Sequence, residues 1–168
     1  EQIVSLPQLF RENGYETVGI GKISHQPGGV MDSLQTIHEV PYVWNKSYAP
    51  VGEWRDPWCA FFSYAGGIAR TSYYGRPTNR TLSPWEAADV PDEGYADGLN
   101  AIEAIKQLNR MKDTTFFLAV GFYKPHLPFN APKKYWDLYD PDKIPAAVYS
   151  ERPEFYRDHT DPSIFLEH

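Results

Sequence analysis

The first apolar positions of the chain recur at helical spacing and then give way to a short buried strand. Apolar side chains three and four residues apart between Ser5 and Asn13 predict a helix, with Ser5 as its N-cap. Gly14 supplies the stop that commonly ends a helix. Residues 15–21 then predict a strand. A helix, a glycine stop and a buried strand together form half of an α/β unit.

A longer amphipathic helix and a second strand follow in the other half of the chain. Six apolar residues recur every three or four positions across residues 92–112 and predict a helix with one apolar face: Tyr95, Leu99, Ile102, Ile105, Leu108 and Met111. Residues 116–122 form a continuous apolar run, as expected of a parallel strand covered on both faces. We therefore expect residues 15–21 and 116–122 to be parallel strands of one sheet, with the helix packed on one face.

Regular periodicity is lost between residues 26 and 91, where prolines and glycines are interspersed with Trp and Tyr. A loop region of this length usually has a binding or lid function, or belongs to an incomplete domain. We interpret the aromatic residues here as packing residues rather than as a platform for sugar rings. Residues 124–165 are expected to form a proline-rich loop with one helical turn near residues 132–139.

The length of 168 residues fits one domain, which we assign to residues 1–165. Both ends of the sequence have the character of an internal piece of a longer protein. The chain begins at Glu1 without Met, and residues 166–168 resemble the start of an expression tag, so we interpret them as a tag remnant.

The charge balance narrows the classes of partner. The chain carries 16 Lys and Arg against 22 Asp and Glu, a net charge of −6. No run of basic residues is present, which argues against a nucleic-acid partner. A small anion is still compatible, because one or two cations can create a local positive pocket. The single cysteine, Cys59, excludes an internal disulfide, and no apolar run is long enough to span a membrane.

Each of the two predicted strands ends in a segment that presents a Lys and a His. Lys22 and His25 follow the first strand, and Lys124 and His126 follow the second. Ligands of open α/β sheets bind at the carboxyl ends of strands. Lys offers a fixed positive charge, and His donates or accepts a proton near neutral pH. These residues suit an oxyanion such as sulfate or phosphate, whose charge grows on the leaving oxygen during cleavage.

The alternative is that these Lys and His side chains are solvated loop residues. Pro125 and Pro128 argue against it, because their fixed φ angles hold the imidazole of His126 in place. The repetition of one design at two strand ends argues against it further. Four other ionisable residues lack such a context and are interpreted as structural or solvated: His38, His159, Asp89 and Asp97.

Two stretches around these motifs resemble the sulfatase family. Residues 6–17, followed by Gly21-Lys22 and His25, are similar to the segment that follows the nucleophile motif of sulfatases. Residues 90–139, above all 116–129, are similar to the iduronate-2-sulfatase type. The two stretches make up a little under half of the chain. The resemblance implies an α/β fold with a largely parallel sheet flanked by helices, as in the alkaline phosphatase-like superfamily.

In sulfatases, a cysteine oxidised to formylglycine attacks sulfur in its hydrated form, above a divalent cation that is usually calcium. The resemblance implies that Lys22 contacts this nucleophile and the sulfate. It implies that His25 binds the formylglycine and helps to release sulfate. His126 matches the sulfate-binding histidine beside the leaving oxygen, a candidate proton donor, and Lys124 matches a residue of the same motif with a substrate-binding role.

The nucleophile and metal-binding motifs of the family are missing from this sequence. Cys59 lies in Trp58-Cys59-Ala60-Phe61, without the Pro and Arg that oxidation to formylglycine requires. No paired-Asp motif follows an N-terminal strand. We therefore expect residues 1–165 to be a partial sulfatase-like catalytic domain that has no metal ligands, binds neither calcium nor formylglycine, and is inactive alone.

The full-length protein is then expected to be a sulfuric ester hydrolase that acts on a sulfated small molecule or a sulfated glycan. The resemblance suggests an exported protein, whether periplasmic, secreted or lysosomal. Two alternatives stay open: a phosphodiesterase or phosphonate hydrolase of the same superfamily, and a non-catalytic anion-binding module. A shared site requires the functional atoms of Lys22, His25 and His126 to lie within roughly 10 Å of one another, because the anion is small.

Overall fold

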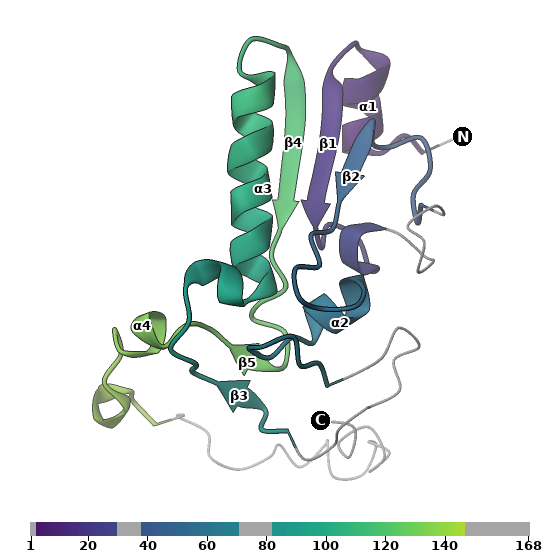
Figure 1. Cartoon of the computed structure of the whole chain (residues 1–168). Helices are drawn as coiled ribbons and strands as arrows, with labels where there is room; N and C mark the ends of the chain where they lie inside the picture. The colour runs from purple at the N-terminus through teal and green to yellow at the C-terminus, as the bar shows by residue number, and fades with distance from the viewer. Residues whose placement is uncertain (1–2, 30–37, 71–81, 147–168) are drawn as a thin grey trace, which may run out of the picture.

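The computed structural model describes residues 3–29, 38–70 and 82–146. A small parallel sheet with its helices forms one end of this part of the chain, and short helices, loops and a strand pair form the other (Figure 1). The tag interpretation of residues 166–168, and His159, lie outside the described residues.

The main sheet has three parallel strands in the order β2–β1–β4. The central strand, β1 (Glu16–Gly21), pairs along its whole length with β4 (Phe116–Gly121), so both strands end at a glycine on the same edge of the sheet. On its other side β1 pairs with β2 (Lys46–Tyr48). The expectation of two parallel strands in one sheet is confirmed.

The two strand-end glycines allow the strands to meet closely where the candidate residues begin. A Cβ atom at Gly21 would overlap the carbonyl oxygen of Gly121, and one at Gly121 would overlap the carbonyl oxygen of Lys22. Gly21 also has a φ of +71°, which favours glycine. As a result, the backbone N–H of Lys22 donates to Gly121 O at 2.9 Å, which ties the first candidate segment to the end of β4.

Helices cover both faces of the sheet. The helix α1 (Leu6–Glu12) begins after Ser5, whose hydroxyl accepts a hydrogen bond from the Gln8 N–H, as expected for its N-cap. Phe10 of α1 stacks on Phe117 of β4, with ring centroids 4.7 Å apart. The helix α3 (Ala96–Met111) packs on the alternate residues of β4, which point to the other face. The predicted fold class, a parallel α/β sheet flanked by helices, is confirmed.

The face by which α3 packs differs from the one predicted. Five residues of α3 are buried, several of them small or polar: Ala96, Asn100, Ala104, Gln107 and Met111. Of the predicted apolar face, Ile102, Ile105 and Leu108 are exposed instead, Ile105 by 59%. The small residues let the helix lie close to the strands, and this close approach turns the larger apolar side chains outward.

Residues 26–91 contain more regular structure than expected. Besides β2, they include α2 (Pro57–Phe61) and β3 (Trp85–Glu86), which pairs in parallel with β5 (Phe129–Asn130). Three 3₁₀ turns, η1 to η3, lie at Pro27–Gly29, Asp92–Gly94 and Pro141–Lys143. The prediction of a continuous loop was wrong because these elements are too short to show a hydrophobic period. The helical turn expected near residues 132–139 is present as α4 (Lys133–Trp136).

Two apolar clusters form the core. One lies between the sheet and α3 and includes Val18 and Ile20 of β1. The other surrounds α2 and joins Trp54 and Phe61 to Tyr123, just after β4. The indole N–H of Trp54 donates to two backbone carbonyl oxygens, at 3.1 and 2.9 Å. This confirms the interpretation of Trp54 as a packing residue.

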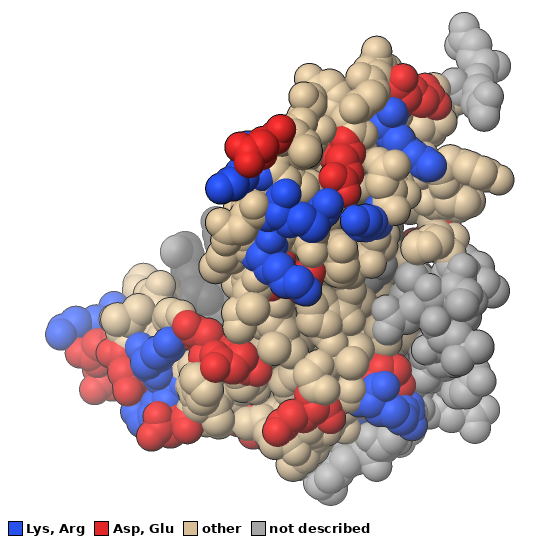
Figure 2. All heavy atoms as spheres, turned by 45° about the horizontal axis from the view of Figure 1, so that its top comes forward, with Lys and Arg blue, Asp and Glu red and all other residues tan. Residues whose placement is uncertain are grey.

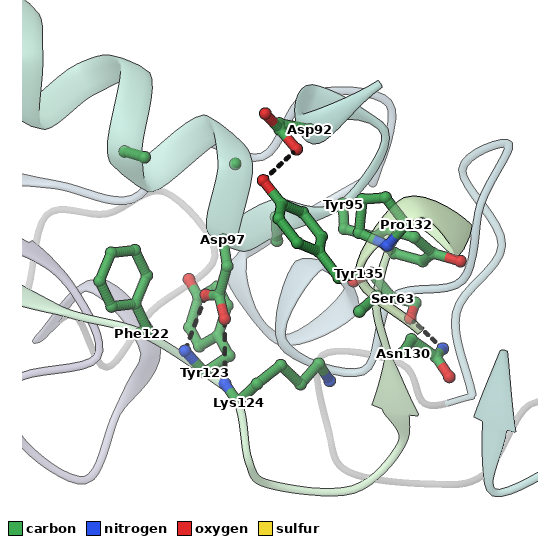
Figure 3. A pocket seen from close by; sticks show the side chains of 14 residues that line it. Ser63, Asp92, Tyr95, Asp97, Phe122, Tyr123, Lys124, Asn130, Pro132 and Tyr135 are labelled. Atoms are coloured by element: carbon green, nitrogen blue, oxygen red, sulfur yellow. Dashed lines mark hydrogen bonds between the residues drawn. The ribbon is translucent and has the colours of Figure 1, made fainter. Parts of the chain in front are cut away.

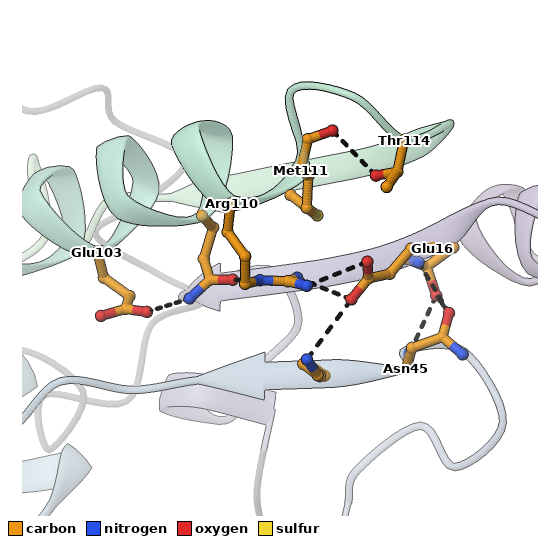
Figure 4. Close-up of polar contacts among 9 residues, drawn as sticks. Glu16, Asn45, Glu103, Arg110, Met111 and Thr114 are labelled. Carbon is orange, nitrogen blue, oxygen red and sulfur yellow. Dashed lines mark hydrogen bonds and ion pairs between the residues drawn. The ribbon is translucent and has the colours of Figure 1, made fainter.

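Polar contacts join α3, β1 and β2 near Glu16, at the end of the sheet where β1 begins (Figure 4). Both terminal nitrogens of Arg110, on α3, donate to the carboxylate of Glu16 on β1, at 3.2 and 2.7 Å. Lys46 of β2 lies 3.6 Å from the same carboxylate.

Basic and acidic side chains are interspersed on the face shown in Figure 2. Within the described ranges, no helix has the length and apolar character needed to cross a membrane.

Candidate functional site

The first candidate segment lies in the turn that follows β1. The ammonium of Lys22 donates to the carbonyl oxygen of Ser24 at 3.0 Å and lies 5.8 Å from the centre of the Phe61 ring. Lys22 is half-buried and His25 is exposed. The imidazole of His25 lies 6.4 Å from the ring of Trp58. Both side chains of this segment therefore face α2.

The second candidate segment lies in the loop between β4 and β5. Asp97, in the first turn of α3, accepts hydrogen bonds from the backbone N–H groups of Tyr123 and Lys124, at 2.7 and 3.0 Å. This fixes the start of the loop. Further on, the imidazole of His126 lies with its ring centre 4.5 Å from that of Phe61. The structural interpretation of Asp97 is confirmed, and its role is to hold the candidate loop.

Phe61 brings the two segments together. Its ring centre lies 5.8 Å from the Lys22 ammonium and 4.5 Å from the centre of the His126 imidazole. The distance between the ammonium and the imidazole centre is therefore at most the sum of these two distances. That range suits two groups that serve one small anion. Trp58, which faces His25, lies 5.7 Å from Phe61. Lys22, His25 and His126 thus each lie near an aromatic ring of α2.

We call the three rings next to these residues, the buried Phe61 and the partly buried Trp58 and Phe62, the aromatic floor. They come from α2 and the residue that ends it, and α2 is held at its start by Asp56, which accepts a hydrogen bond from Cys59 N at 2.8 Å. Sequence reasoning missed this element. An Asp followed by Pro is a recognised helix-start signal, and it stands directly before Trp58.

The side chain of Lys124 lines a cavity to which Lys22, His25 and His126 do not contribute, although its ammonium lies near the backbone of His126. The cavity has a volume of about 340 Å³ and lies between the start of α3, the end of β4 and α4 (Figure 3). The only hydrogen bond that the described residues give the Lys124 ammonium is to the carbonyl oxygen of His126, at 3.4 Å. Burial lowers the pKa of Lys124 from 10.5 to about 8, and the charge of Asp97 partly opposes this shift.

Cys59 is buried in the core around α2, where its thiol is poorly suited to act as a nucleophile. Burial, reinforced by the charge of Asp56, raises the pKa of its thiol from 9.0 to about 11. A thiol is reactive only as the thiolate, and this one is protonated at neutral pH.

The described residues include no group of three or more His, Cys, Asp or Glu side chains placed to hold a metal ion. The carboxylates of Asp56 and Asp97 already accept hydrogen bonds from backbone N–H groups. Calcium requires six to eight oxygen ligands.

The sequence comparisons find sulfatases among the relatives of this chain. The chain is 34% identical to iduronate 2-sulfatase of Mus musculus over 161 residues, 87% of the chain. It is 35% identical to iduronate 2-sulfatase of Homo sapiens over 153 residues, 89% of the chain. A sulfatase of Formosa agariphila is 32% identical over 151 residues, 89% of the chain. The sulfatase resemblance is confirmed.

The matches cover only part of each sulfatase. The chain spans 27% of the mouse protein, 26% of the human protein and 27% of the Formosa protein. No family model matches the chain. The similarity to these sulfatases therefore extends over about a quarter of their length. It does not by itself establish the activity of the whole protein.

Proposed function

We propose that this chain forms the sulfate-binding side of the active site of a sulfuric ester hydrolase of the iduronate 2-sulfatase type. The observation that carries the proposal is the convergence of Lys22 and His126 on Phe61, from segments a hundred residues apart. A sulfatase needs cationic and proton-donating groups around one sulfate, and solvated loop residues would have no reason to meet. The names of the relatives favour sulfate over phosphate esters.

Lys22 would bind the sulfate oxygens. Its ammonium has three N–H groups, and the contact with Ser24 O occupies one of them. The other two N–H groups would donate to the sulfate oxygens. The partial burial of Lys22 next to Phe61 strengthens such a charge-assisted hydrogen bond.

His126 would protonate the leaving oxygen. Its Nδ1 lies 2.6 Å from the carbonyl oxygen of Leu127. A carbonyl oxygen only accepts, so this contact requires the proton on Nδ1 and leaves Nε2 to face the substrate. When the ring carries both protons, the Nε2 proton can pass to the oxygen that leaves as the S–O bond breaks, and the ring is left neutral with its proton on Nδ1. His25, exposed beside Trp58, would act on the nucleophile side and help to release sulfate.

Calcium and formylglycine would be supplied by other parts of the full-length protein. In sulfatases the nucleophile provides the covalent step and the cation stabilises the developing charge, and the sequence of this chain has the motif for neither. The substrate would be a sulfated small molecule or a sulfated glycan. Export of the full-length protein, to the periplasm, the outside or the lysosome, belongs to the same proposal.

Sulfate binding by the chain itself tests the first part of the proposal. In an NMR titration with sodium sulfate at constant ionic strength, the ring signals of His126 and His25 should shift saturably. Lys22→Gln should weaken binding roughly 10-fold, the equivalent of about 1.4 kcal/mol. Lys112→Gln, which removes an exposed lysine after α3, is the matched control. Equal effects of the two variants would remove Lys22 from the site.

Activity of the full-length protein tests the second part. It should hydrolyse an aryl sulfate, and His126→Ala should lower kcat/KM roughly 100- to 10,000-fold. The chain alone should show no turnover, because it lacks a nucleophile. Hydrolysis of a phosphodiester in preference to the sulfate would favour the phosphodiesterase alternative. Sulfate binding without hydrolysis of either ester would favour a non-catalytic anion-binding module.

A further inference from the structure

Phe61 is the one described residue whose ring contacts both halves of the candidate site. It is 2% exposed and belongs to the core around α2. The Lys22 ammonium lies 5.8 Å from its centroid, within the range of a cation–π contact. The His126 ring lies 4.5 Å away, tilted by 47°. A residue that only filled the core would need neither contact.

We propose that Phe61 is a positioning residue, which holds the Lys22 ammonium and the His126 imidazole at a separation that lets one sulfate contact both. The inference rests on the proposed function, because it assigns the device that sets the geometry of that site. Phe61 does not touch the reacting atoms. It acts through the two residues that do.

Lys22 needs such a support because its side chain is long and flexible. A lysine side chain has four rotatable bonds and loses much conformational freedom when its ammonium is fixed. The ring of Phe61 offers its electron-rich face to the ammonium and lowers the number of positions that the ammonium samples. Anion binding then costs less ordering of the side chain, which is the general advantage of a preorganised site.

The ring of Phe61 is itself held on several sides. Tyr123 and Trp58 contact it edge-on, at 5.2 and 5.7 Å, and Phe62 does so at 4.6 Å. Tyr123 is fixed in turn by its backbone hydrogen bond to Asp97. The ring therefore has little freedom to rotate. Its position links the β1 turn, α2 and the β4–β5 loop into one arrangement.

NMR of the unliganded chain tests the geometry without reference to sulfate. Aromatic rings shift the signals of nearby protons, so the ε-methylene of Lys22 and the ring protons of His126 should show ring-current shifts. Phe61→Leu, which keeps an apolar side chain, should abolish the Lys22 shift and reduce the His126 shift, to which the Phe62 ring at 5.7 Å also contributes. Trp54→Phe is the matched control, because Trp54 lies in the same cluster without a ring contact to either residue among those described. A Lys22 shift that is unchanged in Phe61→Leu would overturn the proposal.

Sulfate affinity measured in a double-mutant cycle tests the functional consequence. Phe61→Leu should weaken sulfate binding by roughly 5- to 10-fold. This loss is similar in size to the one expected when Lys22→Gln removes the ammonium. Combined with Lys22→Gln, Phe61→Leu should add less than its effect alone, because the part of the effect that acts through that ammonium is already lost. Trp54→Phe should leave affinity unchanged and should be additive with Lys22→Gln. Full additivity of Phe61→Leu with Lys22→Gln would show that the ring has only a structural role.

The two experiments separate this inference from the function on which it rests. If the unmodified chain shows no saturable sulfate shifts, the sulfate-binding proposal fails. The ring-current measurement still decides whether Phe61 holds the two side chains. If the chain binds sulfate and the cycle is additive, the proposed function stands and the positioning role of Phe61 is wrong.

Discussion

Asp97 accepts a hydrogen bond from the backbone N–H of Lys124 across 27 positions of sequence, at 3.0 Å, and a second at 2.7 Å from the residue before it (Figure 3). A single carboxylate in the first turn of α3 thus fixes the point where β4 turns into the loop that carries His126. The start of a helix is also where the helix dipole favours a negative charge. One side chain therefore joins a long helix, a strand end and a candidate catalytic loop.

Removal of the Asp97 carboxylate should loosen this loop and destabilise the chain. Asp97→Ala leaves two backbone N–H groups without their acceptor, which should cost about 2 kcal/mol or more in the free energy of unfolding. Asp97→Asn keeps one acceptor and should cost less. Urea unfolding gives the free energies, and amide hydrogen exchange should accelerate first at Tyr123 and Lys124. Asp113→Ala, in the exposed turn after α3, is the control. A loss no larger than in the control would contradict this role.

The pKa of Lys124 predicts a distinct dependence of stability on pH. In the folded chain burial lowers this pKa to about 8, whereas in the unfolded chain it returns to about 10.5. Between these values the unfolded state binds more protons, so stability rises with pH. Lys124→Met should abolish this rise. The measurement is the free energy of unfolding at pH 7 and pH 10 in both proteins, and a parallel change in the two would contradict the shift.

The strand ends could be predicted from the sequence because two independent signals coincide there. A glycine ends each strand, and a Lys and a His follow within a few residues. The end-to-end pairing of β1 and β4 then brings the segments after Gly21 and Gly121 to one edge of the sheet. Convergence of Lys22 and His126 follows from topology, which the apolar pattern of the two strands already indicated.

The aromatic floor could not be predicted from the same patterns. The helix α2 has five residues, little more than one turn, so its apolar residues show no period. In the sequence, only the Asp56–Pro57 pair indicates the start of α2, and the same pair is also common in turns. The cavity that the Lys124 side chain lines without His126 was likewise missed, because neighbouring side chains in an irregular loop have no fixed directions.

Cys59 should be inert in the folded chain. Because burial raises the pKa of its thiol to about 11, almost no thiolate is present at pH 8. Ellman's reagent should therefore react slowly with the native chain and rapidly in urea, with a rate that follows unfolding. A Cys59→Ser chain that carries Asp113→Cys, on the exposed turn, provides a fast-reacting control. Equal rates for the two native proteins would show that Cys59 is accessible and ionised.

The outward-facing apolar residues of α3 should contribute little to the stability of this chain. Ile105 is 59% exposed, whereas Met111, on the same helix, is 0% exposed and packs against the sheet. Met111→Ala should lower the free energy of unfolding by about 2–5 kcal/mol, because it removes buried surface and leaves a cavity.

Ile105→Ala removes mainly solvated surface, and Ala is the better helix former, so its effect should stay within about 0.5 kcal/mol. Urea unfolding of the two variants side by side measures the difference. The amphipathic pattern alone predicts comparable losses, because it places Ile105 and Met111 on the same apolar face. The structure predicts a large difference, because α3 meets the strands through Ala104, Gln107 and Met111. Comparable losses would mean that α3 packs in the chain by the face that its sequence pattern indicates.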